Sequence, residues 1–142
     1  MRLFLDSSVM IAGAASAEGA SRSVFLLAGT HDWLLVTTPY AVAETVRNLA
    51  AFPASVTTAW LRLRSALVVV VDDVLTIDKP AVFPVEKDRP ILFSALASAD
   101  VLLTLDRADF SCLLGDRFYG LAIMTPGMWL FREREAGRLE RA

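Results

Sequence analysis

Residues 88–106 of the chain read DRPILFSALASADVLLTLD. Asp88 precedes apolar residues at its i+3, i+4, i+7, i+8 and i+11 positions, which is the spacing of a helix face that packs against a sheet. The mostly apolar run Val101–Leu105 follows, and Asp106 comes directly after it. The segment therefore predicts a core-facing helix that begins at Asp88, then a buried strand over Val101–Thr104 that ends close to Asp106.

The same arrangement of a short apolar strand followed by an aspartate recurs near the N-terminus, where Leu3–Leu5 precedes Asp6. The carboxyl ends of parallel strands meet at one edge of a sheet, which is where α/β proteins bind ligands. We therefore expect Asp6 and Asp106 to lie close together at that edge. Clustered carboxylates repel one another, and a divalent metal ion is the simplest reason to hold them together.

The rest of the chain alternates between strand-like and helix-like segments. Further strands are expected over Arg2–Leu5, Leu34–Thr37, Leu67–Val71 and Leu121–Met124. Helices are expected over Ser8–Ala15, Ser21–Ala28, from Thr38-Pro39 to about Ala51, from Pro53 to about Arg64, from about Asp88 to Ala97, and from Thr125-Pro126 into Arg132–Arg138. Because strands separated by helices imply parallel crossovers, we expect one α/β domain over residues 1–142. Its sheet should be parallel, with about five strands and helices on both faces.

One of these strands and two further segments carry additional expectations. The run Leu67–Val71 is continuous and β-branched, which favours a strand buried on both faces. A short turn of helix is expected over Arg107–Leu114. The stretch Asp72–Lys87, with Pro80 and Pro84, is long and irregular, and loops of this length in compact domains are often functional.

The composition is strongly apolar, with 55% apolar residues, a mean hydropathy of +0.50 and a net charge of −2. Either the sheet is fully buried or part of the apolar surface contacts a partner. The net charge excludes a bulk basic surface, so a polyanion would have to be held locally. The single cysteine, Cys112, excludes an internal disulfide framework, fits a reducing cytoplasm and is expected to pack beside Leu113 and Leu114. No run of about 18 apolar residues is present, so no membrane span is expected.

Each candidate carboxylate also has an ordinary structural explanation. Asp6 and Asp88 stand where helices are expected to begin, and aspartate is a favoured N-cap residue. Glu44 lies three residues before Arg47 on a predicted helix, which is typical of a surface ion pair. Local sequence therefore leaves both a structural and a functional role open for these residues.

Asp106 and Asp109 flank Arg107 and come just after the strand that contains Thr104. They are consistent with a polar turn, or with two more carboxylates at the mouth of a crevice where Thr104 offers a hydroxyl. Asp100 precedes the same strand, so we expect it at the opposite edge of the sheet, in a structural role at the helix–strand junction.

Four segments, in this order, carry a resemblance to a known family. They are Leu5-Asp6-Ser7-Ser8-Val9, Ala43-Glu44, the continuous segment from Lys87-Asp88 to Thr104-Leu105-Asp106-Arg107-Ala108-Asp109-Phe110, and Thr125-Pro126-Gly127-Met128-Trp129-Leu130. With these segments the chain resembles the PIN-domain ribonucleases, and most of all the VapC-like toxins of type II toxin–antitoxin pairs. The match runs from the first strand to the C-terminal helix, and it implies a three-layer α/β/α PIN-like fold.

The resemblance implies a ribonuclease that depends on Mg²⁺ or Mn²⁺. Its catalytic and metal-binding residues would be Asp6, Glu44, Asp88 and Asp106, with Asp109 as a support or second-metal ligand and with Ser8, Thr104 and Arg107 as supporting residues. Arg107 and Arg89 are the candidates for a contact with phosphate, and surface solvation is the preferred explanation for Arg89. The set offers only oxygen ligands and no Cys or His cluster, which suits these hard cations and argues against zinc.

The resemblance also implies a homodimer, RNA as the substrate and a small antitoxin that lies across an apolar groove. Val24, Phe25 and Leu27 are candidates for that groove, and core packing explains them equally well. Two other functions stay open. One is a non-catalytic PIN-fold scaffold or RNA-binding protein, and the other is a receiver-type phosphoacceptor domain, because Val68–Asp73 imitates the first strand and acidic pair of such domains.

Overall fold

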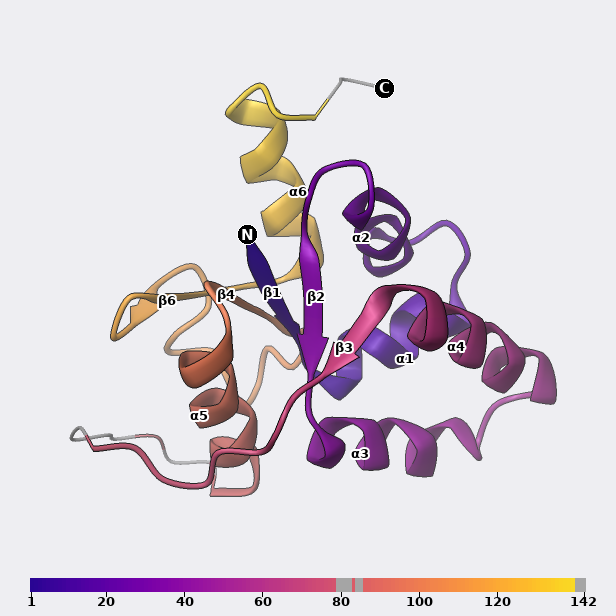
Figure 1. The fold of residues 1–142 in the computed structure, drawn as a ribbon, viewed down its shortest axis with the longest axis horizontal. Coiled ribbons are helices and arrows are strands. Elements are labelled where there is room, and N and C mark those ends of the chain that lie inside the picture. Colours follow the sequence, from indigo (N-terminus) through magenta and orange to yellow (C-terminus); the bar gives the residue numbers. More distant parts are fainter. Residues whose placement is uncertain (79–82, 84–85, 140–142) are drawn as a thin grey trace.

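The computed structural model describes residues 1–78, 83 and 86–139, so Pro80 and Pro84 of the predicted irregular stretch lie outside the described residues. The described residues form a six-stranded, mostly parallel sheet with the strand order β3-β2-β1-β4-β6-β5 (Figure 1). Its strands are β1 (Arg2–Leu5), β2 (Leu34–Thr37), β3 (Val68–Val70), β4 (Val101–Leu103), β5 (Arg117–Phe118) and β6 (Leu121–Met124). The predicted α/β class is confirmed.

Strand β1 lies inside the sheet, between β2 and β4. From β1 the chain moves outward through β2 to β3, then returns to the other side of β1 to form β4 and β6. The strand order therefore reverses between β1 and β4, and open α/β sheets bind ligands at such a switch point. Leu5 pairs with Leu103 across this point, so the residues that follow the two strands emerge side by side.

The sheet has helices on both faces. They are α1 (Ser7–Ala15), α2 (Ala20–Ala28), α3 (Pro39–Leu49), α4 (Ala54–Leu67), α5 (Arg89–Ser98) and α6 (Pro126–Glu135), with a 3₁₀ turn over Glu86–Asp88 before α5. The crossovers from β1 to β2 and from β2 to β3 run toward the edge of the sheet that β3 forms. The crossover from β3 to β4 runs back in the opposite direction, past β2 and β1. Right-handed connections then place α1–α4 and α5 on opposite faces. The contacts agree, because α1 packs against α2, α3 and α4, whereas α5 packs against β1 and β4.

Four helices begin at the N-cap residues that the sequence predicts, which are Asp6, Thr38, Asp88 and Thr125. The Thr125 hydroxyl accepts from the Met128 backbone N–H at 3.1 Å, so it satisfies one of the free donors of the first turn of α6. Helix α6 ends at Glu135 instead of continuing through position 138. The chain turns away there, and residue 137 is a glycine with a φ of +77°.

The predicted burial of the third strand is wrong. Strand β3 is shorter than expected and lies at the edge of the sheet, where Val69 is 46% exposed and Val70 is 40% exposed. A β-branched run predicts a strand, but only the strand order decides whether neighbours cover both of its faces.

Two local predictions also differ from the structure on the far side of β4. Residues 107–115 form a series of turns, not a turn of helix. Strand β5, which was not predicted, has two residues and pairs antiparallel with β6. It lies between Gly115 (φ +80°) and Gly120 (φ +86°), and a strand of two residues is too short to produce a periodic pattern.

The apolar residues of the second helix serve mainly in the core. Val24 and Phe25 are fully buried, and Leu27 packs partly buried against the core, so core packing explains the first two and a docking groove does not. Cys112 is exposed, so the prediction that it packs beside its leucine neighbours is wrong. Within the described residues, no helix is both long and apolar enough to cross a membrane.

Candidate metal centre

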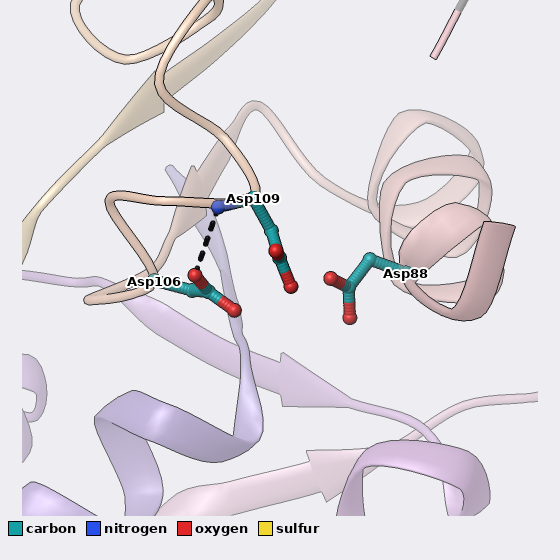
Figure 2. Close-up of side chains that lie close together, drawn as sticks. All are labelled: Asp88, Asp106 and Asp109. Atoms are coloured by element: carbon teal, nitrogen blue, oxygen red, sulfur yellow. Dashed lines mark hydrogen bonds between the residues drawn. The ribbon is translucent and has the colours of Figure 1, made fainter. Parts of the chain in front are cut away.

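Three of the predicted carboxylates converge at the carboxyl edge of the sheet. Asp88 ends the 3₁₀ turn that leads into α5, whereas Asp106 and Asp109 lie in the loop after β4. One oxygen from each carboxylate lies within 4.8 Å of those of the other two. Figure 2 shows the carboxylates of Asp109 and Asp88 facing each other, with Asp106 beside them. A single cation can therefore reach all three side chains.

Hydrogen bonds hold the loop after β4 in a shape that brings Asp106 and Asp109 together. Asp106 Oδ1 accepts from the Asp109 backbone N–H at 3.0 Å, and the Asp106 backbone N–H donates to Thr104 Oγ1 at 3.1 Å. Phe110 anchors the loop, since it is fully buried and its ring centroid lies 5.1 Å from that of Phe83. The sequence left a polar turn and a pair of carboxylates as alternatives. In the structure, the loop after β4 is a polar turn, and the same turn brings the carboxylates of Asp106 and Asp109 together.

Asp88 is the most buried of the three, with 5% of its surface exposed. Its Oδ2 atom has no hydrogen-bond partner in the described part of the chain. Burial, hydrogen bonding with Asp109 and the charge of Asp6 raise the pKa of Asp88 to about 8. The pKa of Asp109 is lowered, first by its hydrogen bond with Asp88 and then by that with Asp106. In the absence of a cation, these opposite shifts favour a proton on Asp88 and an ionised Asp109.

Asp6 has the N-cap role that the sequence offered, and its second oxygen is bound by side chains near the other carboxylates. As the N-cap of α1, it accepts from the Ser7 backbone N–H at 2.8 Å. Its other oxygen accepts from the Ser8 hydroxyl at 3.0 Å and from the Thr104 hydroxyl at 2.7 Å. Burial raises the pKa of Asp6, although the hydrogen bonds from Thr104 and Ser8 oppose that rise. Asp6 lies outside the group of three, but its charge contributes to the raised pKa of Asp88.

Ser8 and Thr104 connect the segment after β1 with the segment after β4. Each hydroxyl donates to Asp6 and also accepts a backbone N–H of the loop after β4. The Leu105 N–H donates to Ser8 at 3.0 Å, and the Asp106 N–H donates to Thr104 at 3.1 Å. These two predicted supporting residues therefore hold Asp6 next to the loop that carries the other carboxylates.

Glu44 lies on α3, partly buried and outside the group of three. The Ser7 hydroxyl donates to its carboxylate, and its negative charge adds to the rise in the pKa of Asp6. The expected ion pair with Arg47 is not among the ion pairs that the described residues form. Ser7, which was not predicted as a site residue, therefore links Glu44 to the N-terminus of α1, where Asp6 lies.

The structure does not bring Arg107 into the group of carboxylates. Arg107 is exposed and lines a pocket of about 480 Å³ whose walls include Met124, Met128 and Phe131, and none of the five candidate carboxylates lines this pocket. Its contact with phosphate stays a prediction. Asp100 lies at the opposite edge of the sheet and accepts from the Arg2 backbone N–H at 2.8 Å, so its predicted structural role is confirmed.

Two residues beside the group of three were not predicted. Lys87, at the end of the predicted irregular stretch, has a side chain that is 70% exposed, yet its Nζ lies 3.2 Å from Asp109 Oδ2. Tyr40, on α3, donates its hydroxyl to the Lys87 carbonyl at 2.6 Å, and its own backbone N–H donates to Asp73 at 3.2 Å. The signal in the sequence was limited to the position of Lys87 directly before Asp88.

The geometry fits a divalent metal ion. Carboxylates that lie this close repel one another, and the buried, unpartnered oxygen of Asp88 is costly unless a donor or a cation satisfies it. All ligands of the group are carboxylate oxygens, which hard cations such as Mg²⁺ and Mn²⁺ prefer. Asp88, Asp106 and Asp109 can therefore hold a divalent cation. Asp6 lies outside this group and is linked to the loop after β4 through Thr104.

A comparison with solved structures finds this fold in another protein. One chain in the crystal structure of VapBC2 from Rickettsia felis, bound to a DNA fragment from their promoter, matches with a TM-score of 0.59 and 13% sequence identity. The match covers 87% of this chain and 97% of the other. At this identity it shows the fold alone, and it agrees with the fold expected from the sequence. No family model matches the chain, and no curated protein does.

Proposed function

We propose that the protein is an endoribonuclease that depends on Mg²⁺ or Mn²⁺ and acts as the toxin of a toxin–antitoxin pair. The observation that carries the proposal is the convergence of Asp88, Asp106 and Asp109, together with the buried Oδ2 atom of Asp88, which has no hydrogen-bond partner among the described residues. Two further observations support it. The chain shares its fold with a chain of a VapBC2 structure, and its sequence resembles the VapC-like toxins.

In this proposal Asp88, Asp106 and Asp109 bind the ion, and Asp6 and Glu44 complete the catalytic carboxylates. When bound, the ion supplies a water of lowered pKa and neutralises charge on the scissile phosphate. The residues of the chain hold the carboxylates in position through the hydroxyls of Ser7, Ser8 and Thr104.

The proposal uses no histidine as a base. The single histidine, His31, lies at the end of α2, where its Nδ1 is 3.0 Å from the Leu27 carbonyl oxygen. Its ring centroid lies 5.3 Å from that of Trp33, so it caps the end of this helix and packs against Trp33. In this proposal, activation of the attacking water therefore depends on a cation held by carboxylate oxygens.

The proposal is tested by cleavage of a mixed single-stranded RNA pool with Mn²⁺ and with EDTA. The central variant is Asp106→Asn, because asparagine keeps an oxygen that can accept from the Asp109 N–H. We expect cleavage that needs the cation and that falls at least about 100-fold in the variant, since a ligand carboxylate is lost. Binding of Mn²⁺, measured by calorimetry on the same two proteins, should weaken in parallel.

Asp72→Asn is the matched control. Asp72 also follows a strand, is exposed, and does not belong to the group of three. The control should cleave and bind Mn²⁺ as the wild type does. Cleavage that survives EDTA or the Asp106→Asn change would contradict the proposal. A folded protein that binds no Mn²⁺ would instead favour the non-catalytic scaffold.

We also propose a small antitoxin and a second copy of the chain as partners, with the cytoplasm as the location. The support is that the similar chain belongs to a VapBC2 structure bound to promoter DNA. Light scattering coupled to gel filtration measures the mass of the protein alone, and a monomer at micromolar concentration would contradict the homodimer.

A further inference from the structure

Lys87 places a positive charge on the group of carboxylates. Its ammonium lies 3.2 Å from Asp109 Oδ2. Hydrogen bonding and charge from Asp109, followed by the charge of Asp88 and then of Asp106, raise the pKa of Lys87. A further ion pair joins Arg138 to Glu133, in the segment at the end of α6 and away from this group. Lys87 is therefore the cation paired with this group.

The backbone of Lys87 is held while its side chain is free to move. The Tyr40 hydroxyl donates to the Lys87 carbonyl at 2.6 Å, and the next residue, Asp88, is buried at the start of α5. The Lys87 side chain is 70% exposed, so no packing restrains the long aliphatic stem. The ammonium can therefore leave Asp109 without any change in the fold.

A divalent cation and the Lys87 ammonium compete for the carboxylate of Asp109. The oxygen that pairs with Lys87 belongs to one of the three residues that can hold the cation, and like charges at this distance repel. An ammonium is also a strongly hydrated point charge, which binds phosphate as readily as carboxylate. The chain has a net charge of −2, so an RNA backbone at this acidic edge needs such a local cation.

We propose that Lys87 is a counter-ion for the metal-free site, that a divalent cation displaces it from Asp109, and that the displaced ammonium then contacts an RNA phosphate beside the site. This inference rests on the proposed function, because it requires that the carboxylates bind a cation and that RNA is the substrate. It adds a substrate-binding residue that changes partner when the cation binds.

The inference predicts opposite effects of one substitution on two binding equilibria. In Lys87→Met, which keeps a long flexible side chain, Mn²⁺ affinity at low ionic strength should rise about two- to fivefold, because a competing charge is removed. The difference should shrink in 0.5 M NaCl, since salt screens an exposed pair. Calorimetric titration of Mn²⁺ into the metal-free protein measures both.

The same variant should bind RNA more weakly once the site is saturated with Mn²⁺. We expect a loss of about two- to fivefold for a fluorescent single-stranded RNA pool whose linkages are nuclease-resistant phosphorothioates, with intact RNA verified on a gel. The slope of log affinity against log salt should fall by about 0.7, the value for one phosphate contact on a single strand. A residue that only supports the fold would lower both affinities and leave the salt slope unchanged.

Two controls make the result specific. Arg134→Met removes the same charge from an exposed position near the end of α6, and it should leave Mn²⁺ affinity unchanged. In an Asp109→Asn background, where the ion pair is already lost, Lys87→Met should no longer raise Mn²⁺ affinity.

The outcomes separate this inference from the proposed function. If the wild type binds Mn²⁺ and RNA but Lys87→Met leaves Mn²⁺ affinity unchanged or lowers it, the displacement is wrong and the proposed function stands. If RNA affinity and its salt slope do not change, the phosphate contact is wrong. A folded wild type that binds neither Mn²⁺ nor RNA would overturn both proposals together.

Discussion

At the scale of single residues, burial determines what each carboxylate can do. Asp6 and Asp88 are 4% and 5% exposed, and burial is the first cause of the raised pKa of each. Both stand at helix N-termini at the ligand-binding edge of the sheet, but the side chain of Asp6 caps its helix whereas that of Asp88 makes no capping hydrogen bond. An N-cap position and a site position are therefore compatible, because helix N-termini after parallel strands face that edge.

The raised pKa of Asp88 predicts that the metal-free protein loses stability as the pH rises from about 4 to about 8. The native state keeps a proton on Asp88 up to its pKa of about 8, whereas the unfolded chain releases it near 3.8. The native state therefore binds more protons across this window, and the free energy of unfolding falls with pH. Urea unfolding in EDTA at pH 5 and pH 8 measures the difference.

Asp88→Asn should remove much of this pH dependence and should be more stable than the wild type at pH 8 in EDTA. Part of the dependence should remain, because burial also raises the pKa of Asp6. The lowered pKa of Asp109 acts only below about pH 4, where its stabilising effect is lost as the carboxylate is protonated. An unchanged slope in Asp88→Asn would show that Asp88 is ionised in the native state at neutral pH.

Thr104 gives a second prediction at the residue scale. Thr104→Val removes a hydroxyl that donates to the buried Asp6 at 2.7 Å and keeps the shape of the side chain. We expect a loss of about 1–3 kcal/mol in the free energy of unfolding, because a buried carboxylate oxygen loses a donor. Thr104→Ser retains the hydroxyl and should lose less. Equal losses in the two variants would assign the effect to packing.

At the scale of elements, α1 is the helix that positions the first part of the site. Its first turn carries Asp6, Ser7 and Ser8, so its place on the sheet sets where Asp6 meets the loop after β4. Its other end packs against α2 through Gly13. A Cβ at Gly13 would lie 2.7 Å from Phe25 Cε2 and 3.0 Å from Cδ2, so the two helices pack at a distance that only glycine allows.

Gly13→Ala should therefore destabilise the protein although alanine favours helices. Phe25 is fully buried and cannot move aside freely. Overpacking costs about 1–3 kcal/mol, which outweighs a helix-propensity gain of about 1 kcal/mol. The net loss of up to about 2 kcal/mol is measurable by urea unfolding.

Gly29→Ala is the matched control for this prediction. Gly29 has a φ of −66°, and no other atom lies within 4 Å of the place that an alanine methyl group would take, so alanine fits without strain. The variant should be as stable as the wild type or more stable by up to about 1 kcal/mol. A destabilised control together with a neutral Gly13→Ala would contradict the packing explanation.

At the scale of the whole molecule, the strand order brings residues far apart in sequence to one place. The reversal between β1 and β4 sets the segment after Leu5 beside the segment after Leu103, and α5 carries Asp88 to the same edge. Cation binding at this edge therefore joins the loop after β4 to the start of α5, and it should stabilise the folded protein as a unit.

We predict that Mn²⁺ at about 100 times its dissociation constant raises the free energy of unfolding by about 2.7 kcal/mol. The unfolded chain does not hold Asp88, Asp106 and Asp109 together, so the cation binds the native state preferentially. A thermal melt with and without Mn²⁺ measures the shift. Asp106→Asn should lose most of it, and a shift of equal size in that variant would place the cation elsewhere.

The sequence predicted most elements because their signals are local. Strands β1, β2 and β6 agree with the predicted ranges, and most helix ends agree within two residues, because caps, prolines and apolar spacing act over a few residues. The burial of β3 and the existence of β5 were not predictable in this way. Both depend on which strand lies next to which, and that is a property of the strand order.

The same division holds for the site. Their positions directly after strands were enough to predict Asp6 and Asp106 at one edge of the sheet, and the helix spacing after Asp88 indicated where that residue lies. The resemblance to PIN-domain ribonucleases added Glu44 and the metal-binding roles of the whole set. By itself the sequence determined which carboxylates stand at the carboxyl edge of a parallel sheet. Only the tertiary structure decided which of them approach within 4.8 Å, that Ser7 links Glu44 to α1, and that Lys87 pairs with Asp109. These contacts join residues on different elements, and their distances depend on how those elements pack.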